Sequence, residues 1–280
     1  MFFNVQAHNE RIAVFKDTMS RIESDSRLQQ AVLSSIASQV FYPEGQPIAL
    51  PTPPYAEPAQ VIVTKNRSFE AARPYAEQGL KVAVLNFASS TSPGGGVTRG
   101  ASAQEECLCR VSTLYPCLND KRMWDVFYTP HRKAKNPLHN DDIIYTKDVV
   151  VFKDDDLQPL DKPFMVDVIS SAAPTLREVT TNRYNPSDGE HVDVTPEELL
   201  AIHEKRGRLI LESAAANGAE VLILGAFGCG AFKNDPAVVA QAYANILPEY
   251  LHYFRTIEFA VYCRPNDDSN YHAFKEIIKV

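Results

Sequence analysis

Three consecutive glycines and a Gln-Glu-Glu triplet lie seven residues apart in the stretch "PGGGVTRGASAQEECLCR", which begins at Pro93. Consecutive glycines cost more conformational entropy on folding than other residues do, so their presence needs a reason. A frequent reason is the close approach of a ligand, often a phosphate, to main-chain N–H groups. The stretch therefore predicts an anion-binding loop with two carboxylates beside it.

The two carboxylates belong to Glu105 and Glu106, in the first turn of a helix that is predicted to start with Ser102 as its N-cap. Successive helical side chains diverge by roughly 100°, so the two carboxylates are not expected to point at the same atom. One would then reach the reacting group while the other orients it. The alternative is that both are ordinary first-turn acids that favour the positive end of the helix dipole.

A second glycine stretch, "LGAFGCGAFKNDP", also follows a buried apolar run. If both runs are strands of one sheet, two main-chain surfaces can face each other across a single pyrophosphate. Neither stretch contains GxxxxGK[ST] or GxGxxG, which argues against ATP hydrolysis and hydride transfer. The alternative is that the glycines only form turns.

Bulk composition limits the partners of the chain. Its 280 residues carry a net charge of −7 with a pI near 5.5, which argues against a broad basic surface for nucleic acid. The five cysteines are an odd set without CxxC spacing, so neither a disulfide framework nor a zinc knuckle is predicted, and a reducing cytosol is favoured. No stretch resembles a signal peptide or a membrane span, so a soluble, intracellular protein is expected.

Strand-like and helix-like segments alternate along most of the chain. Two helices are predicted between about residues 10 and 39, followed by the proline-rich connector "FYPEGQPIALPTPPYAEPAQ". From residue 59 the alternation predicts an α/β domain with a mixed, mostly parallel sheet that binds ligands at the carboxyl ends of its strands. The expected domains are a helical extension over residues 1–58 and a catalytic domain over residues 59–280. The segment 118–145 is expected to be an irregular insertion that forms one wall of a cleft.

Other candidate residues favour structural interpretations. Cys229 has no fixed His nearby, so its small size between two glycines explains it better than nucleophilic catalysis. His131 and His139 lack metal-ligand spacing. Ser170 and Ser171 lack a GxSxG elbow, and the acids at 154–156 suit a solvated turn.

The stretch "VLNFASSTSPGGGVTRGASAQEECLCRVSTLYPCL" resembles the signature of the bacterial-type (microbial) poly(ADP-ribose) glycohydrolases, in which GGG is followed closely by QEE. "LGAFGCGAFKNDP" is similar to the second phosphate loop of that family. The resemblance extends from the N-terminal helices to the C-terminal "FAVYC". It implies a macrodomain, a three-layer α/β/α fold that binds ADP-ribose.

The resemblance also implies roles for individual residues. Glu106 would be the catalytic acid, and Glu105 would hold the ribose hydroxyls. Substrate contacts would come from the first glycine loop, the second glycine loop and two further polar residues: Gly94, Gly95 and Gly96; Gly228, Cys229, Gly230, Ala231 and Phe232; Asn86 and Gln104. The glycines of both loops would contact the diphosphate, and those of the first loop also the distal ribose. Phe232 would lie against the ribose or adenosine. No metal or cofactor is implied.

Three positions depart from the family pattern. Ser92 stands where the family often has Asn, "AAPT" at 172–175 replaces "PAPN", and Phe227 replaces a Trp. These changes are expected to leave binding intact and to bear on the rate of turnover.

The resemblance predicts hydrolysis of the ribose–ribose O-glycosidic bond of poly(ADP-ribose), with release of ADP-ribose. The leaving oxygen needs a proton, and burial beside a diphosphate raises the pKa of a carboxylic acid enough to hold one. Two alternatives remain: a non-catalytic ADP-ribose reader, and a hydrolase of mono-ADP-ribosylated protein or another nucleoside-diphosphate sugar. The expected partners are poly(ADP-ribose) or ADP-ribosylated protein, with neither direct DNA binding nor membrane attachment.

Overall fold

A computed structural model describes residues 2–181 and 189–279 of the chain. Within them a seven-stranded sheet has the order β1-β4-β5-β3-β6-β7-β2. The strands are β1 Val40–Tyr42, β2 Gln60–Thr64, β3 Val82–Phe87, β4 Ile143–Lys153, β5 Pro159–Ser171, β6 Val221–Leu224 and β7 Thr256–Ala260. β2, β3, β5, β6 and β7 run parallel, whereas β1 and β4 pair antiparallel with their neighbours. The mixed, mostly parallel α/β sheet is therefore confirmed.

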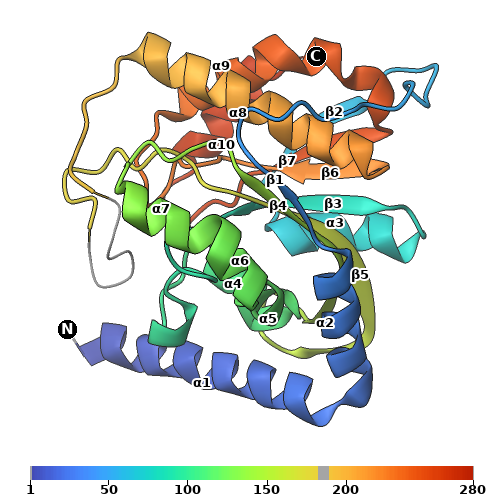
Figure 1. The fold of residues 1–280 in the computed structure, drawn as a ribbon, viewed down its shortest axis with the longest axis vertical. Helices are drawn as coiled ribbons and strands as arrows, with labels where there is room; N and C mark the ends of the chain where they lie inside the picture. Colours follow the sequence, from blue (N-terminus) through green and yellow to red (C-terminus); the bar gives the residue numbers. More distant parts are fainter. Residues whose placement is uncertain (1, 182–188, 280) are drawn as a thin grey trace.

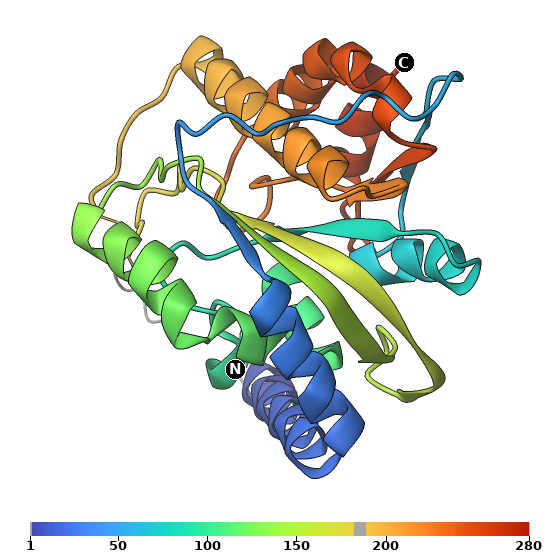
Figure 2. The same ribbon diagram turned by 45° about the vertical axis from the view of Figure 1, so that its right-hand side comes forward.

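Helices cover both faces of this sheet (Figure 1). The helices are α1 Phe2–Ser24, α2 Ser26–Ser38, α3 Ser68–Glu77, α4 Gln104–Val111, α5 Leu114–Leu118, α6 Lys121–Met123, α7 Thr129–Ala134, α8 Pro196–Ala216, α9 Pro236–Ile246 and α10 Ser269–Ile277. α8, α9 and α10 lie on one side of the sheet, and α3 and α4 to α7 lie on the other (Figures 1 and 2). The arrangement has the three layers expected of a macrodomain-like fold.

Alternation along the strands builds a separate core on each face. Leu85 of β3 packs with Leu222 and with apolar residues of α8, α9 and α10. The next residue back, Val84, packs with Ile223 and with α3, α4 and α5. Successive side chains of a strand point to opposite faces, so an almost fully apolar strand is the pattern of a sheet buried on both sides.

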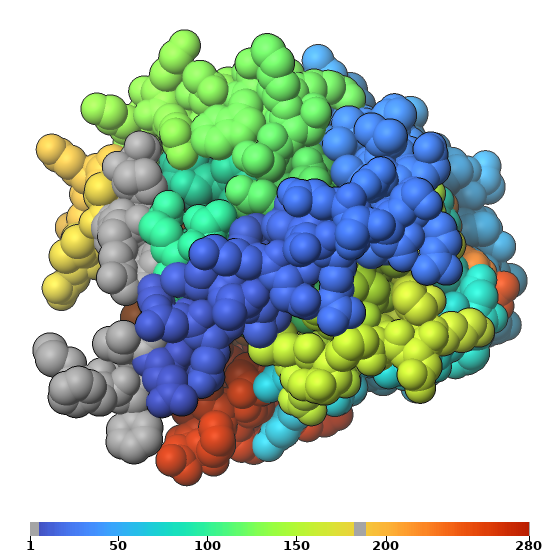
Figure 3. All heavy atoms as spheres, turned by 90° about the horizontal axis from the view of Figure 1, so that it is seen from below, coloured from blue at the N-terminus to red at the C-terminus, as the bar shows by residue number. Residues whose placement is uncertain are grey.

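The N-terminal helices pack on the α4 side of the domain. Phe15 of α1 is buried and meets the ring of Tyr115 edge-on at 4.9 Å. Ile22 and Val32 form a small core with Cys117 and Phe152. Seen from below, α1 and α2 lie across this face, between the α5–α7 region and the β4–β5 hairpin (Figure 3).

The connector that follows the N-terminal helices is not extended throughout, so this expectation is wrong. Phe41 and Tyr42, expected in an extended connector, belong to edge strand β1 and pair with Ile144 and Ile143 of β4. A strand of three residues is too short to carry a periodic signal.

The expectation of an irregular insertion at 118–145 is also wrong. Most of this segment is regular, because it holds α6, the π-helix η2 (Trp124–Tyr128), α7 and the start of β4. Its charge and proline content did not indicate this order. Asp120 caps the start of α6, because its side chain accepts a hydrogen bond from Arg122 N at 2.9 Å. The aromatic rings of Phe127 and Tyr128 are buried.

Candidate active site

Both glycine loops leave the sheet at the same edge. The first follows β3 at Phe87 and the second follows β6 at Leu224, and these strands are parallel neighbours with Val84 opposite Ile223. The carboxyl ends of neighbouring parallel strands meet at one edge, so the loops must lie close together. The expectation that both loops lie on one rim is confirmed.

The first loop is wound so tightly that only glycine fits at its centre. Gly94 and Gly95 have φ angles of 64° and 59°. A Cβ on Gly94 would lie 2.8 Å from Cδ2 of Tyr115, and one on Gly95 would lie 2.6 Å from Oε1 of Glu106. The missing side chain of Gly94 thus makes room for Tyr115, and that of Gly95 makes room for the carboxylates of α4.

Glu106 is held at one oxygen and unpartnered at the other. Its Oε1 accepts a hydrogen bond from Gly96 N at 2.8 Å. Its Oε2 is buried and has no hydrogen-bond partner within residues 2–181 and 189–279. A buried carboxylate oxygen without a partner is costly, so it marks a position where a ligand or water belongs.

Glu105 is more fully enclosed. Its Oε2 accepts from Ser89 N at 2.7 Å and its Oε1 from Asn86 Nδ2 at 3.4 Å. Burial raises the pKa of the Glu105 carboxyl well above its usual range, and the nearby charge of Glu106 raises it further, against the N–H donors that lower it.

The two carboxylates converge more than helix geometry predicts. A Cβ on Gly95 would lie 2.6 Å from Oε1 of Glu106 and 3.2 Å from Oε2 of Glu105. The expectation that they could not point at one place is wrong, because amides from one loop attract both flexible side chains to it. The helix also starts one residue later than expected, with Ala103 rather than Ser102 as its N-cap.

Gln104 connects the start of α4 to strand β3 through hydrogen bonds. Its Oε1 accepts from Phe87 N at 2.9 Å, and its Nε2 donates to Leu85 O at 2.8 Å and to Ser68 Oγ at 3.0 Å. Both amide hydrogens are used within the protein. Gln104 therefore positions the carboxylates rather than offering a free donor to a substrate.

Asn86 and its neighbours add polar atoms at the ends of β3 and β5. Asn86 is fully buried and donates to Ser170 Oγ at 2.9 Å, while its Oδ1 has no partner among the described residues. The hydroxyls of Ser90 and Ser171 are likewise buried without a partner in that part of the chain. Together with Glu106 Oε2, these atoms form a set of unmet hydrogen-bonding groups at one edge of the sheet.

Asn234, which the sequence analysis did not single out, holds the second loop in place through hydrogen bonds. Asn234 is buried, and its Nδ2 donates to Pro174 O at 2.7 Å and to Gly228 O at 3.2 Å. Its Oδ1 lies 2.7 Å from Nε2 of His203. A Cβ on Gly228 would approach Asn234 Nδ2 to 2.8 Å, at a φ of 79°. An Asn just before an Asp-Pro helix start looks like an ordinary turn residue, so nothing in the sequence revealed this role.

The outer part of the second loop presents free donors. Gly230 and Ala231 are exposed, and Phe232 is half-buried. The N–H groups of these three residues donate to no acceptor in the described part of the chain. Phe232 lies between the His139 ring at 6.2 Å and the Arg177 guanidinium at 5.6 Å. A run of free amides beside an aromatic ring suits a nucleoside diphosphate.

The surroundings of Cys229, His131 and His139 fit the structural interpretation of these three residues. Burial raises the pKa of the Cys229 thiol, which disfavours the reactive thiolate. His131 contacts Phe127 O and Asn140 Oδ1, and His139 contacts Thr175 Oγ1. Within residues 2–181 and 189–279, no group of three or more His, Cys, Asp or Glu side chains could hold a metal ion. No helix in those ranges is long and apolar enough to cross a membrane.

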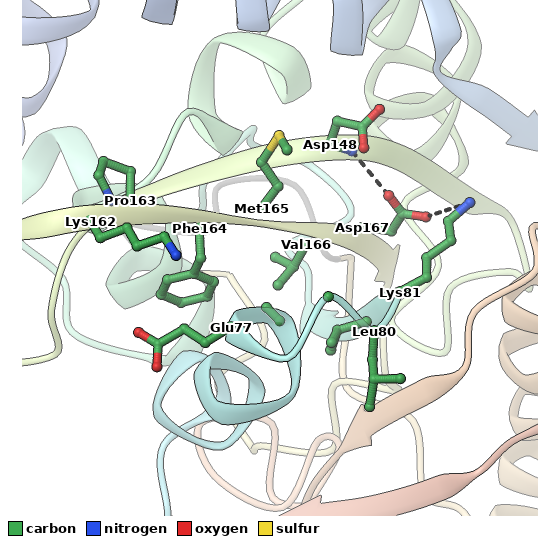
Figure 4. Close-up of a pocket in the computed structure, with 13 residues that line it drawn as sticks. Glu77, Leu80, Lys81, Asp148, Lys162, Pro163, Phe164, Met165, Val166 and Asp167 are labelled. Atoms are coloured by element: carbon green, nitrogen blue, oxygen red, sulfur yellow. Dashed lines mark hydrogen bonds and ion pairs between the residues drawn. The ribbon is translucent and has the colours of Figure 1, made fainter.

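A surface hollow lies at the opposite end of β3, where α3 ends and β5 begins (Figure 4). There Asp167 accepts from Asp148 N at 3.0 Å and lies 3.6 Å from Lys81 Nζ. Tyr145 OH also donates to Asp167, at 2.7 Å. These partners satisfy the carboxylate, and the hollow is remote from both glycine loops.

The fold and site define a macrodomain-like α/β protein with a buried carboxylate pair set against a glycine loop. The profile of the family described as "Microbial-type PARG, catalytic domain" matches residues 9–154. The chain belongs to this microbial-type family of poly(ADP-ribose) glycohydrolases (PARG). A comparison with curated proteins gave no match.

Solved structures agree over nearly the whole chain. Poly(ADP-ribose) glycohydrolase from Thermomonospora curvata is 29% identical with a TM-score of 0.81, over 96% of this chain and 99% of that one. The same enzyme bound to the inhibitor ADP-HPD is 30% identical with a TM-score of 0.79, at the same coverage. The Deinococcus radiodurans enzyme in complex with ADP-ribose is 30% identical with a TM-score of 0.72, over 88% of this chain and 95% of that one.

Proposed function

We propose that this chain hydrolyses the ribose–ribose O-glycosidic bond of poly(ADP-ribose) and releases ADP-ribose. The observation that carries the proposal is the state of Glu106: one oxygen is fixed by Gly96 N–H, and the other is buried beside the glycine loop with no partner among the residues that the structure describes. Family membership supports the same reaction.

Glu106 supplies the proton transfer. Its Oε2 delivers a proton to the leaving ribose oxygen while the glycosidic C–O bond breaks and positive charge develops on the sugar ring. The resulting carboxylate then takes a proton from the water that attacks the same carbon. Each turnover thus consumes one water and returns Glu106 to its starting state.

Glu105 keeps a proton in the carboxyl pair and orients the sugar. Burial, and then the nearby Glu106, raise the pKa of Glu105, so the carboxyl pair retains a proton at a pH where an exposed carboxyl would ionise, and this proton is available to Glu106 for the transfer. A neutral carboxyl can both donate to and accept from a ribose hydroxyl. The unpartnered Asn86 Oδ1 and Ser171 Oγ offer further hydrogen bonds to the same sugar.

The second loop takes the diphosphate. The free N–H groups of Gly230, Ala231 and Phe232 are suited to phosphate oxygens. Gly228 and Cys229 shape the inner turn of this loop, and the Phe232 ring packs against the ribose or adenosine. This assignment narrows the expected role of the first loop. Gly95 N donates to Ser92 O and Gly96 N to Glu106, so these glycines serve the carboxylates and the distal ribose.

Two further proposals concern the whole chain. Residues 1–58 act as an extension that packs against the catalytic domain of residues 59–280, where Phe15 and Ile22 are buried, and that adds edge strand β1 to its sheet. All five cysteines are free, which suits the reducing cytoplasm.

Incubation of the purified chain with end-labelled poly(ADP-ribose), followed by separation of the products, tests the activity. The expected product is free ADP-ribose. Binding of polymer without cleavage would identify a reader. Cleavage of mono-ADP-ribosylated protein, with polymer left intact, would identify the other hydrolase.

A further inference from the structure

Arg132 of α7 contacts the segment that leads into the first glycine loop. Its Nε donates to Thr91 O at 2.6 Å, and one of its terminal nitrogens lies 3.5 Å from Ser92 Oγ. Its guanidinium lies 4.6 Å from the ring centroid of Trp124, the single tryptophan of the chain. No carboxylate in the described part of the chain pairs with Arg132. Its contacts are therefore with the loop and an aromatic face, unlike those of an ordinary surface ion pair.

The segment that Arg132 contacts carries the donors of both carboxylates. Upstream of Thr91, Ser89 N donates to Glu105 Oε2 at 2.7 Å. Downstream, Gly96 N donates to Glu106 Oε1 at 2.8 Å. Arg132 thus contacts the main chain between these two donors.

Internal hydrogen bonds make the same segment behave as one unit. Ser89 Oγ accepts from Thr91 N at 3.3 Å and from Ser92 N at 3.2 Å. Ser92 O accepts from Gly95 N at 2.9 Å. A displacement at Thr91 is therefore transmitted to the Ser89 amide on one side and to the glycines on the other.

We infer that Arg132 is a positioning residue for catalysis, which holds residues 88–96 so that their amides fix both carboxylates at once. The inference rests on the proposed function. It extends that function to the η2–α7 element, which neither glycine motif contains. The π-helix η2 places Trp124 under the guanidinium, and π-helical turns are frequent at functional sites.

Lysine cannot replace this arginine. The contact needs a planar group that stacks on the Trp124 ring and donates edge-on to Thr91 O, while a lysine ammonium is compact and strongly hydrated. Arg132→Lys keeps the charge and loses the geometry, so it separates positioning from electrostatic attraction of the anionic substrate.

Steady-state hydrolysis of poly(ADP-ribose) by wild type, Arg132→Ala, Arg132→Lys and Lys133→Ala is the kinetic test. For both Arg132 variants we expect kcat to fall roughly 10- to 100-fold, the scale of an ångström-sized misplacement of catalytic groups, with ADP-ribose affinity within about threefold of wild type. Lys133 is the matched control, because it is an exposed cation on the same helix with no hydrogen bond or ion pair in the described part of the chain, and its variant should match wild type. Guanidinium ion at low millimolar concentration should partly restore Arg132→Ala and have no such effect on Arg132→Lys.

Hydrogen–deuterium exchange of a peptide covering residues 88–97 gives a readout that does not depend on activity. Both Arg132 variants should exchange this segment faster than wild type and Lys133→Ala, while the second loop is unchanged. Unaltered exchange, or a kcat equal to wild type, would overturn the role of Arg132 even if the enzyme is active. If wild type itself fails to cleave polymer, the proposed function fails, and the exchange measurement still decides whether Arg132 holds the segment.

Discussion

The two glycine loops look alike in the sequence and differ in what their amides do. In the first, Gly95 N and Gly96 N donate to acceptors inside the protein, one of which is the Glu106 carboxylate. In the second, the N–H groups of Gly230, Ala231 and Phe232 have no acceptor in the described part of the chain. The first loop is thus completed by the protein's own side chains, and the second is left open for a ligand.

The difference shows that a glycine-rich loop after a strand has two uses. Glycine provides either space for a neighbouring side chain, as Gly95 does for Glu106, or an accessible main chain, as at Gly230, where a Cβ would meet no atom of the described residues within 4 Å. We therefore expect changes in the first loop to act on turnover and changes in the second to act on binding.

Glu106→Gln should have the largest effect. The substitution is isosteric and keeps an oxygen for Gly96 N–H, but it removes the proton donor, so turnover of poly(ADP-ribose) should fall by at least ~10²-fold. ADP-ribose affinity, measured by calorimetry, should change little. Glu276→Gln on α10, at an exposed position, is the matched control. Glu106→Gln with wild-type turnover would place the catalytic acid elsewhere.

Phe232→Ala should act on binding instead. Loss of a ring that packs on a ribose or base weakens binding by roughly 1–3 kcal/mol. Calorimetry with ADP-ribose measures this change, and thermal unfolding checks that the fold is kept. Val179 is an exposed apolar residue on the segment next to the second loop, and Val179→Ala should leave the affinity for ADP-ribose unchanged. Equal affinity in a folded Phe232→Ala variant would show that the ring serves only packing.

Gly95→Ala and Gly230→Ala form a matched pair across the two loops. At Gly95 the new Cβ would lie 2.6 Å from Glu106 Oε1 at a φ of 59°, so the carboxylate must move and turnover should fall about tenfold. At Gly230 the methyl group meets open space, and its amide is kept, so turnover should match wild type. A larger kinetic loss at Gly230 than at Gly95 would reverse the division of roles between the loops.

Glu105→Gln should change how stability depends on pH. A carboxyl whose pKa is raised by folding stabilises the native state while protonated, and this contribution is lost as the pH rises through the folded pKa. Wild type and variant should be equally stable below the usual pKa of 4.5, and the variant should be the more stable one above the folded pKa. Urea unfolding across this range tests the prediction. A stability difference that shrinks as the pH rises would contradict it.

The sequence predicted the elements and the common rim of the loops because these follow from short-range patterns. Apolar strands followed by glycines, Asp235 before Pro236, and Pro196 at the start of a helix all carry local signals, and the structure has strands or helix starts at each. The same patterns located Glu105 and Glu106 in the first turn of one helix.

The contacts that complete the site were beyond sequence reasoning because they join distant residues. Arg132 reaches Thr91 across 41 positions, and Asn234 reaches Pro174 across 60. Convergence of the two carboxylates depends on the path of the glycine loop, which positive φ angles allow but do not specify. The short strand β1 is fixed only by its pairing with β4.

A crystal structure of the wild-type chain with ADP-ribose tests the division of roles between the loops most directly. The diphosphate oxygens should accept hydrogen bonds from the amides of Gly230, Ala231 and Phe232, and the distal ribose should face Oε2 of Glu106. Gly96 N should still donate to Glu106 Oε1. A diphosphate held by Gly95 and Gly96, with the carboxylates displaced from their amides, would contradict the account.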